Sequence, residues 1–124
     1  MKTHNLIALV LILFAACAKL EPVKTGQFFK TDGVKVKVVS VSDSRCPTGA
    51  FCVTEGQVIV NFLATKGSAS ESFQLQLTGT DEGADTVLMG YVFKLKTVTP
   101  FPDVDDPTTQ VNEEKLVDLS IIKQ

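Results

Sequence analysis

Short runs in which apolar and polar residues alternate are the feature that most limits how this chain can fold. Four alternating runs lie at residues 34–38, 73–77, 91–96 and 116–122, and a more evenly apolar run lies at 57–65. Successive side chains of a β-strand point to opposite faces, so an alternating run predicts a strand with one buried face. The evenly apolar run is typical of a central strand. No helical period of convincing length occurs.

Turn-forming segments separate these runs. They are Thr31-Asp32-Gly33, Lys66-Gly67-Ser68, residues 80–85 and the proline-rich residues 100–107. Six to seven short strands in about 100 residues predict an all-β fold, namely a single small, immunoglobulin-like β-sandwich, with a small barrel as the alternative. Phe62, Phe73 and Phe93 are then expected in the core.

Residues 1–16 predict a secretory signal peptide that is removed from the mature protein. Lys2 supplies a positive charge, and the apolar segment from Leu6 to Phe14 is followed by Ala15 and Ala16. A helix that spans a bilayer needs about 20 apolar residues, so this segment is too short to remain as an anchor.

The end of the signal segment, Phe14-Ala15-Ala16-Cys17, resembles the lipobox of bacterial lipoproteins, although Phe14 replaces the commoner leucine. The resemblance implies cleavage before Cys17 and acylation of that residue with diacylglycerol and a further acyl chain such as palmitate, which gives stable anchoring. Ala18 follows where aspartate would indicate retention in the inner membrane, so we expect the outer membrane. The alternative is an ordinary signal peptide with a buried or free Cys17.

The predicted domains are therefore the signal peptide 1–16, a lipidated tether 17–26 and the β-sandwich domain 27–124. The mature chain has 11 basic and 14 acidic residues, because Lys2 is removed from the total of 12 basic residues, and no basic patch remains to bind nucleic acid. The sole histidine, His4, is also removed. Without the commonest general base we expect no enzyme, and we expect no cofactor.

Cys46 and Cys52 enclose five residues, including Pro47 and Gly49. If Cys17 is acylated, these two cysteines remain as a pair in an oxidising compartment, and a disulfide is predicted. Metal binding is the alternative, but two thiolates without histidine do not complete a usual zinc site. A thioredoxin-like redox pair would have two intervening residues.

The segment around these cysteines resembles a group of uncharacterised bacterial lipoproteins that are common in Bacteroidetes. Their motif runs Asp-Ser-Arg-Cys-Pro, a few residues, and then Cys-x-Trp-x-Gly before a strand. Residues 43–47 match fully, as do Cys52 and Gly56, whereas Thr54 stands in place of tryptophan. Gly90-Tyr91, Leu95 and Pro100-Phe101-Pro102 resemble the group's second block. The resemblance covers roughly residues 26–123 and implies a β-sandwich and an envelope location, with no agreed activity.

Two sets of polar residues are candidate sites. Asp43 and Arg45 flank a tight turn, where they either stabilise the loop or form a ligand-binding pair. Asp103, Asp105 and Asp106 are candidate calcium ligands, although their spacing does not match an EF-hand and they lack its glycine. A solvated loop is the simpler interpretation, and no metal site is predicted.

The favoured function is that of a non-enzymatic envelope lipoprotein, held on the lipid bilayer through Cys17 and binding another envelope protein or stabilising an assembly. A module that binds a small ligand or calcium through its acidic loops is the alternative. A hydrolase that uses carboxylates alone is a third hypothesis, and it needs a deep cleft with two carboxylates of displaced pKa.

Overall fold

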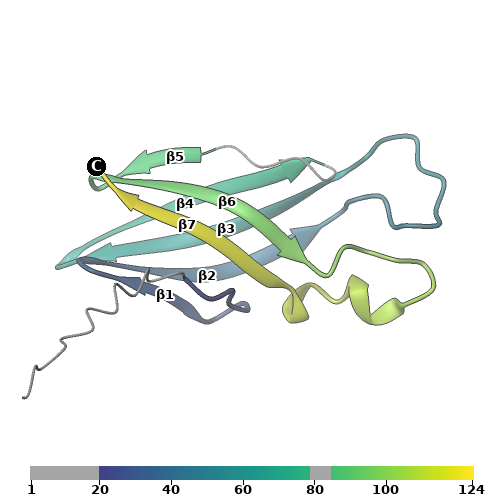
Figure 1. The fold of residues 1–124 in the computed structure, drawn as a ribbon, viewed down its shortest axis with the longest axis horizontal. Helices are drawn as coiled ribbons and strands as arrows, with labels where there is room; N and C mark the ends of the chain where they lie inside the picture. The colour runs from purple at the N-terminus through teal and green to yellow at the C-terminus, as the bar shows by residue number, and fades with distance from the viewer. Residues whose placement is uncertain (1–19, 79–84) are drawn as a thin grey trace, which may run out of the picture.

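The computed structural model describes residues 20–78 and 85–124, so the predicted signal peptide and Cys17 lie outside it. The described residues form seven β-strands and two short 3₁₀ helices (Figure 1). These are β1 (Phe28–Thr31), β2 (Val34–Asp43), β3 (Gln57–Lys66), β4 (Ala69–Thr78), β5 (Asp85–Leu88), β6 (Tyr91–Thr99), η1 (Pro107–Gln110), η2 (Asn112–Glu114) and β7 (Leu116–Lys123).

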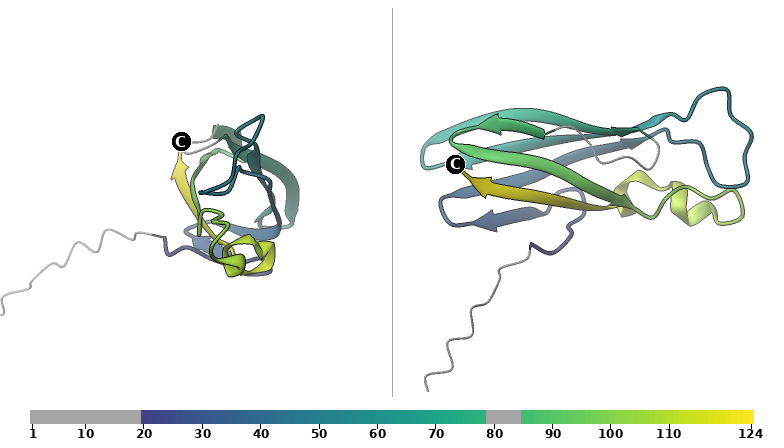
Figure 2. Two further views of the ribbon diagram at one scale, coloured as in Figure 1. Left: turned by 90° about the vertical axis from the view of Figure 1, so that its right-hand side faces the viewer. Right: turned by 45° about the horizontal axis from the view of Figure 1, so that its top comes forward.

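The strands form two separate antiparallel sheets, one of four strands in the order β1-β2-β3-β4 and one of three in the order β5-β6-β7. The sheets face each other across the core (Figures 1 and 2), which confirms the predicted all-β sandwich. In each sheet every strand pairs with its neighbour in sequence. Immunoglobulin domains instead distribute their strands between the sheets through Greek-key connections, so the likeness lies in the layers and the strand number.

Apolar side chains from both sheets fill the space between them. Phe62 and Phe93 are buried, whereas Phe73 is half-buried between them, with ring centroids 4.9 Å from Phe62 and 4.8 Å from Phe93. These rings join the inner faces of the two sheets. The predicted aromatic core is thus confirmed, with Phe73 at its margin.

A bulge in β2 changes which residues point inward. Val36 and Val38 are buried, the register then shifts at Val39, and beyond it Val41 and Asp43 face the core instead of Ser40 and Ser42. An extra residue in one strand reverses the alternation of its side chains. The bulge therefore turns Asp43, and the loop that follows it, toward the inside.

The N-terminal segment belongs to the packed domain further upstream than predicted. Val23 and Val117 exchange two backbone hydrogen bonds of 3.0 and 2.8 Å, and Leu20 and Val23 pack against the core. The predicted boundary at residue 27 is therefore too late, because part of the expected tether binds the edge of β7. The segment from Leu20 to Gly26 has too few alternations of apolar and polar residues to indicate such pairing on its own.

Candidate functional site

The most distinctive site is the loop of residues 44–56, which joins β2 to β3. Its base is closed by two backbone hydrogen bonds, from the Ser44 amide to the Gln57 carbonyl and from the Cys46 amide to the Glu55 carbonyl, both 2.8 Å. Gly56 adopts φ +67°, and a β-carbon there would lie 1.9 Å from the Ser44 carbonyl oxygen. Only glycine allows the two ends of the loop to approach so closely.

Cys46 and Cys52 form a disulfide across this loop, with their α-carbons 5.9 Å apart. The disulfide predicted from cysteine parity is confirmed. It closes the outer half of the loop, while Gly56 and the backbone hydrogen bonds close its base.

Beneath the loop lies a buried cluster of three charged residues, Asp43, Arg45 and Lys115, which we call the charged cluster. The Arg45 guanidinium donates to both Asp43 carboxylate oxygens, from Nε to Oδ1 at 2.9 Å and from Nη2 to Oδ2 at 2.7 Å. Lys115 Nζ lies 3.0 Å from Asp43 Oδ2. The side chains of Asp43, Arg45 and Lys115 are 1%, 4% and 0% exposed.

Arg45 and Lys115 also donate hydrogen bonds to backbone carbonyls. Arg45 Nη2 donates to the Val98 carbonyl at 2.8 Å, and Lys115 Nζ donates to the carbonyls of Pro100, at 2.6 Å, and Thr109. The Arg45 guanidinium also lies 4.6 Å from the centre of the Phe101 ring. Among the described residues, no buried side-chain nitrogen or oxygen lacks a hydrogen-bond partner. The charged cluster therefore ties the disulfide loop to β6 and to the segment after it.

The same contacts determine the ionisation of Asp43. Burial alone would raise the pKa of its carboxyl, but hydrogen bonds from Arg45 and then from Lys115 outweigh burial and hold the pKa below its ordinary value of 3.8. Asp43 is thus an anion held between two cations. Because its hydrogen bonds go to protein groups, this geometry favours the structural interpretation of Asp43 and Arg45, while ligand binding by the pair stays a prediction without further support.

The sequence did not indicate Lys115 as a member of this site. It follows three acidic or amide residues and precedes β7 by one position, a context typical of an exposed lysine. Its burial depends on the carbonyls of the 100–111 segment, which folds over it. No local pattern reveals such a tertiary contact.

Above the charged cluster, the loop exposes apolar side chains. Phe51 and Val53 are 106% and 104% exposed relative to their reference areas, and Val104 of the neighbouring segment is 43% exposed. We call these three residues the apolar tip. The 44–56 loop and the segment that contains Val104 lie at the same end of the sandwich (Figure 2). They are joined by hydrogen bonds from the Thr48 amide to the Pro102 carbonyl, 2.8 Å, and from the Val104 amide to the Thr48 carbonyl, 3.1 Å.

Two of the candidate calcium ligands accept hydrogen bonds from backbone amides of their own segment. Asp103 Oδ1 accepts a hydrogen bond from the Asp105 amide at 2.9 Å, and Asp106 Oδ1 accepts one from the Thr108 amide at 3.1 Å, where it caps η1. In residues 20–78 and 85–124 no group of three or more histidine, cysteine, aspartate or glutamate side chains is placed to hold a metal ion. The acidic turn predicted at residues 80–85 lies outside the described part of the chain, except for Asp85.

Three hollows in the described surface of the sandwich bear on the hydrolase hypothesis. They are lined by residues around Lys30 and Lys35, around Val39 and Asn61, and around Gln76 and Asp85. Together they contain one carboxylate, that of Asp85. They therefore do not supply the two carboxylates that a carboxylate-only hydrolase requires.

Comparison of the chain with protein-family models, with curated proteins and with solved structures finds no match. Neither 3₁₀ helix of the described residues is long and apolar enough to cross a membrane. The candidate site is thus the apolar tip on its buried base, and its function is inferred from that geometry.

Proposed function

We propose that this protein is a lipid-anchored protein of the bacterial envelope, on the outer membrane, that binds another envelope protein through its apolar tip. The observation that supports this proposal most is the complete exposure of Phe51 and Val53 on a loop whose base is fixed. The lipid anchor rests on the signal segment and Cys17.

The rigid base of the 44–56 loop makes the apolar tip suited to binding. The disulfide, Gly56 and the charged cluster restrict the loop before any partner arrives. A preorganised loop loses less conformational entropy on association than a flexible one. A phenylalanine that enters a pocket of a partner is also the kind of residue that contributes most to binding energy.

Charges around the apolar tip indicate what kind of surface it meets. Asp105, which is exposed, and Asp103 lie in the segment that pairs with Thr48, and Glu55 is exposed near the loop base. These carboxylates disfavour insertion of the tip into an anionic membrane. They favour a protein partner with an apolar pocket that is bordered by basic residues.

Site-specific crosslinking in intact cells tests the contact. A photoreactive amino acid at position 53 is expected to give one defined adduct, which Phe51→Ser abolishes, whereas the same group at Gln76 of the exposed β4 surface gives none. Loss of the adduct in Phe51→Ser must occur at an unchanged protein level. Identical adducts from positions 53 and 76, or an adduct that persists in Phe51→Ser, would refute the proposed contact.

Metabolic labelling with a fatty-acid analogue tests the anchor independently. The wild-type protein is expected to incorporate the label and to fractionate with membranes, and Cys17→Ser is expected to lose the label and enter the soluble fraction. Cys46→Ser with Cys52→Ser is the matched control and retains the label. Membrane association and labelling that survive Cys17→Ser would contradict the lipoprotein assignment.

A further inference from the structure

The outer surface of the β1–β2 hairpin bears three lysines and a phenylalanine. In the register of the pair, Phe28 lies opposite Lys37 and Lys30 lies opposite Lys35. Phe29 and Val36, the intervening residues, point into the core. Phe28, Lys30, Lys35 and Lys37 therefore share the outer surface, and we call them the lysine face. The sequence showed no basic patch because these lysines alternate with apolar residues and only strand pairing brings them together.

The lysine face has no acidic partner among the described residues. None of its three lysines forms an ion pair there, and their outer-face neighbours on β3, Leu63 and Thr65, are uncharged. Asp32, the acid nearest to Lys30 in the sequence, lies in the hairpin turn and forms no ion pair with these lysines. Two like charges directly opposite each other destabilise a sheet. The Lys30–Lys35 pair therefore does not itself stabilise the sheet, although Lys35 Nζ lies 4.1 Å from the centre of the Phe28 ring.

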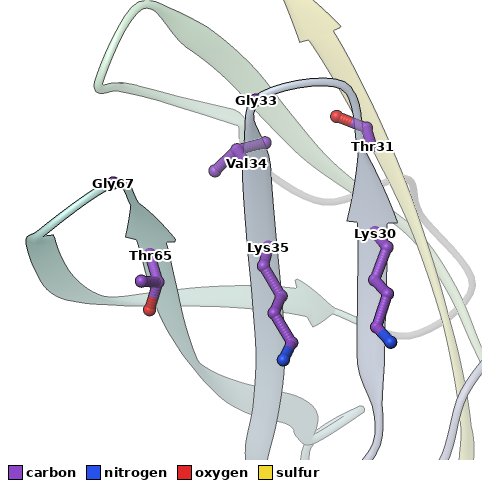
Figure 3. Close-up of a pocket in the computed structure, with 7 residues that line it drawn as sticks. All are labelled: Lys30, Thr31, Gly33, Val34, Lys35, Thr65 and Gly67. Atoms are coloured by element: carbon purple, nitrogen blue, oxygen red, sulfur yellow. The ribbon is translucent and has the colours of Figure 1, made fainter.

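A hollow of about 360 Å³ lies beside these lysines, where the β1–β2 and β3–β4 turns meet. Its lining includes Lys30, Thr31, Lys35 and Thr65 (Figure 3). In Figure 3 the side chains of Lys30 and Lys35 extend side by side in the same direction. Two ammonium groups that extend side by side on one surface are suited to bind phosphate oxygens.

Charge is segregated along the molecule. The β1–β2 turn and the 103–114 segment lie at opposite ends of the long axis (Figure 1). The second segment contains five acids, Asp103, Asp105, Asp106, Glu113 and Glu114. Such a distribution orients a protein so that its basic end faces an anionic surface and its acidic end faces away.

We propose that the lysine face docks on the phosphate groups of anionic membrane lipids and so orients the domain on its membrane. This inference rests on the proposed lipid anchor, because Lys30 is only thirteen residues after Cys17 and an acylated Cys17 keeps the lysine face close to the headgroups. Phe28, which is 40% exposed and lies 4.1 Å from Lys35 Nζ, adds an aromatic ring that suits the interface between headgroups and acyl chains. The 44–56 loop lies at the other end of the long axis from the β1–β2 turn (Figure 1), so docking of the lysine face leaves the apolar tip uncovered.

Lysine labelling on vesicles tests the docking. The purified lipidated protein is placed on vesicles of phosphatidylcholine alone or of phosphatidylcholine with phosphatidylglycerol, and acetylation by a water-soluble reagent is followed by mass spectrometry. Three lysines near an anionic surface favour docking by roughly 100-fold, so labelling of Lys30 and Lys35 is expected to slow by a similar factor on the anionic vesicles. Lys96, exposed on the other sheet, is expected to react equally on both.

Variants separate the lysine face from a general charge effect. Lys30→Gln with Lys37→Gln leaves Lys35 as a reporter, and its protection is expected to fall to about fivefold, whereas Lys96→Gln leaves full protection. Salt of about 1 M, at which the Debye length is about 3 Å, is expected to remove the protection.

The outcomes distinguish the two proposals. Failure of the protein to remain on neutral vesicles contradicts the lipid anchor. Stable retention with equal labelling of Lys30 and Lys35 on both vesicle types overturns the lysine face alone. Protection by free inorganic phosphate without vesicles also overturns it, since the hollow would then bind a soluble anion.

Discussion

Lys115 and Lys35 are the same residue type in opposite surroundings. Lys115 is buried at one end of the sandwich, where its ammonium group pairs with a carboxylate and donates hydrogen bonds to two carbonyls. Lys35 is exposed toward the other end, opposite a second lysine and without an acidic partner in the described residues. The first lysine has all its interactions within the protein, while the second has its charge available to something outside it.

This difference separates residues that maintain the fold from residues that recognise a surface. Removing one member of the charged cluster leaves buried charges uncompensated, which is strongly destabilising. Removing a lysine of the lysine face relieves repulsion, so the fold tolerates it or becomes more stable. The predictions below test this contrast from the largest effect to the smallest.

Asp43→Asn is expected to lower the free energy of unfolding by about 3–5 kcal/mol, because Arg45 and Lys115 would then be buried without a counter-charge. Urea unfolding followed by circular dichroism measures the change. Asp32→Asn makes the same chemical change in an exposed turn and is expected to stay within about 0.5 kcal/mol of the wild type. Equal effects of the two substitutions would show that the charged cluster contributes nothing special.

Cys46→Ser with Cys52→Ser is expected to lower the free energy of unfolding by about 2 kcal/mol, since the disulfide closes a short loop. The same urea titration gives this value. The charged cluster lies at the base of the loop and does not need the disulfide, so the double variant is expected to keep its fold. A loss as large as that of Asp43→Asn would indicate that the disulfide also holds the charged cluster in place.

Acid is expected to weaken the charged cluster gradually. The lowered pKa of Asp43 means that its contribution is complete above its ordinary pKa of 3.8 and is lost as the pH falls through the lower pKa of the folded state. The difference in unfolding free energy between the wild type and Asp43→Asn should therefore shrink as the pH falls below about 4. A difference that stays constant down to about pH 2 would mean that the carboxyl of Asp43 has the same pKa in the folded and unfolded states, which contradicts the lowered pKa.

Lys30→Glu is expected to raise the free energy of unfolding by about 0.5 kcal/mol, because it replaces a like-charge pair with Lys35 by an attractive one. The midpoint of urea unfolding is a sufficient measure. Lys96→Glu, which changes the same charge on the other sheet, has no lysine opposite it in the register and is the control. Destabilisation by Lys30→Glu alone would show that Lys30 supports the fold.

Much of the fold follows from local pattern. The alternation of Val34, Val36 and Val38, and that of Tyr91, Phe93 and Leu95, is reproduced in the buried faces of β2 and β6. The disulfide follows from cysteine parity. Strands β1 and β5 were not predicted, because four residues each are too few to establish a period and both depend on a longer neighbour for pairing.

The site is less accessible to sequence reasoning because bulges reverse the alternation. Val38 and Val39 are adjacent apolar residues, and this doublet is the sign in the sequence that the strand changes phase before Asp43. A similar shift between Leu95 and Thr97 in β6 brings Val98 inward, where its carbonyl accepts from Arg45. The doublet indicates a bulge only in retrospect, since an exposed valine is also compatible with an uninterrupted strand.

The pairing of Val23 with Val117 has a mechanical consequence. Tension on the N-terminal end would first break these two backbone hydrogen bonds and then the bond from the Gly26 amide to the Val38 carbonyl, before it reaches the ladder of β1 and β2. Each residue released in this way adds about 3.4 Å of extended chain. If the N-terminal end is anchored as proposed, we expect the segment from Leu20 to Gly26 to detach before the strands separate and to add about 20 Å of extended chain.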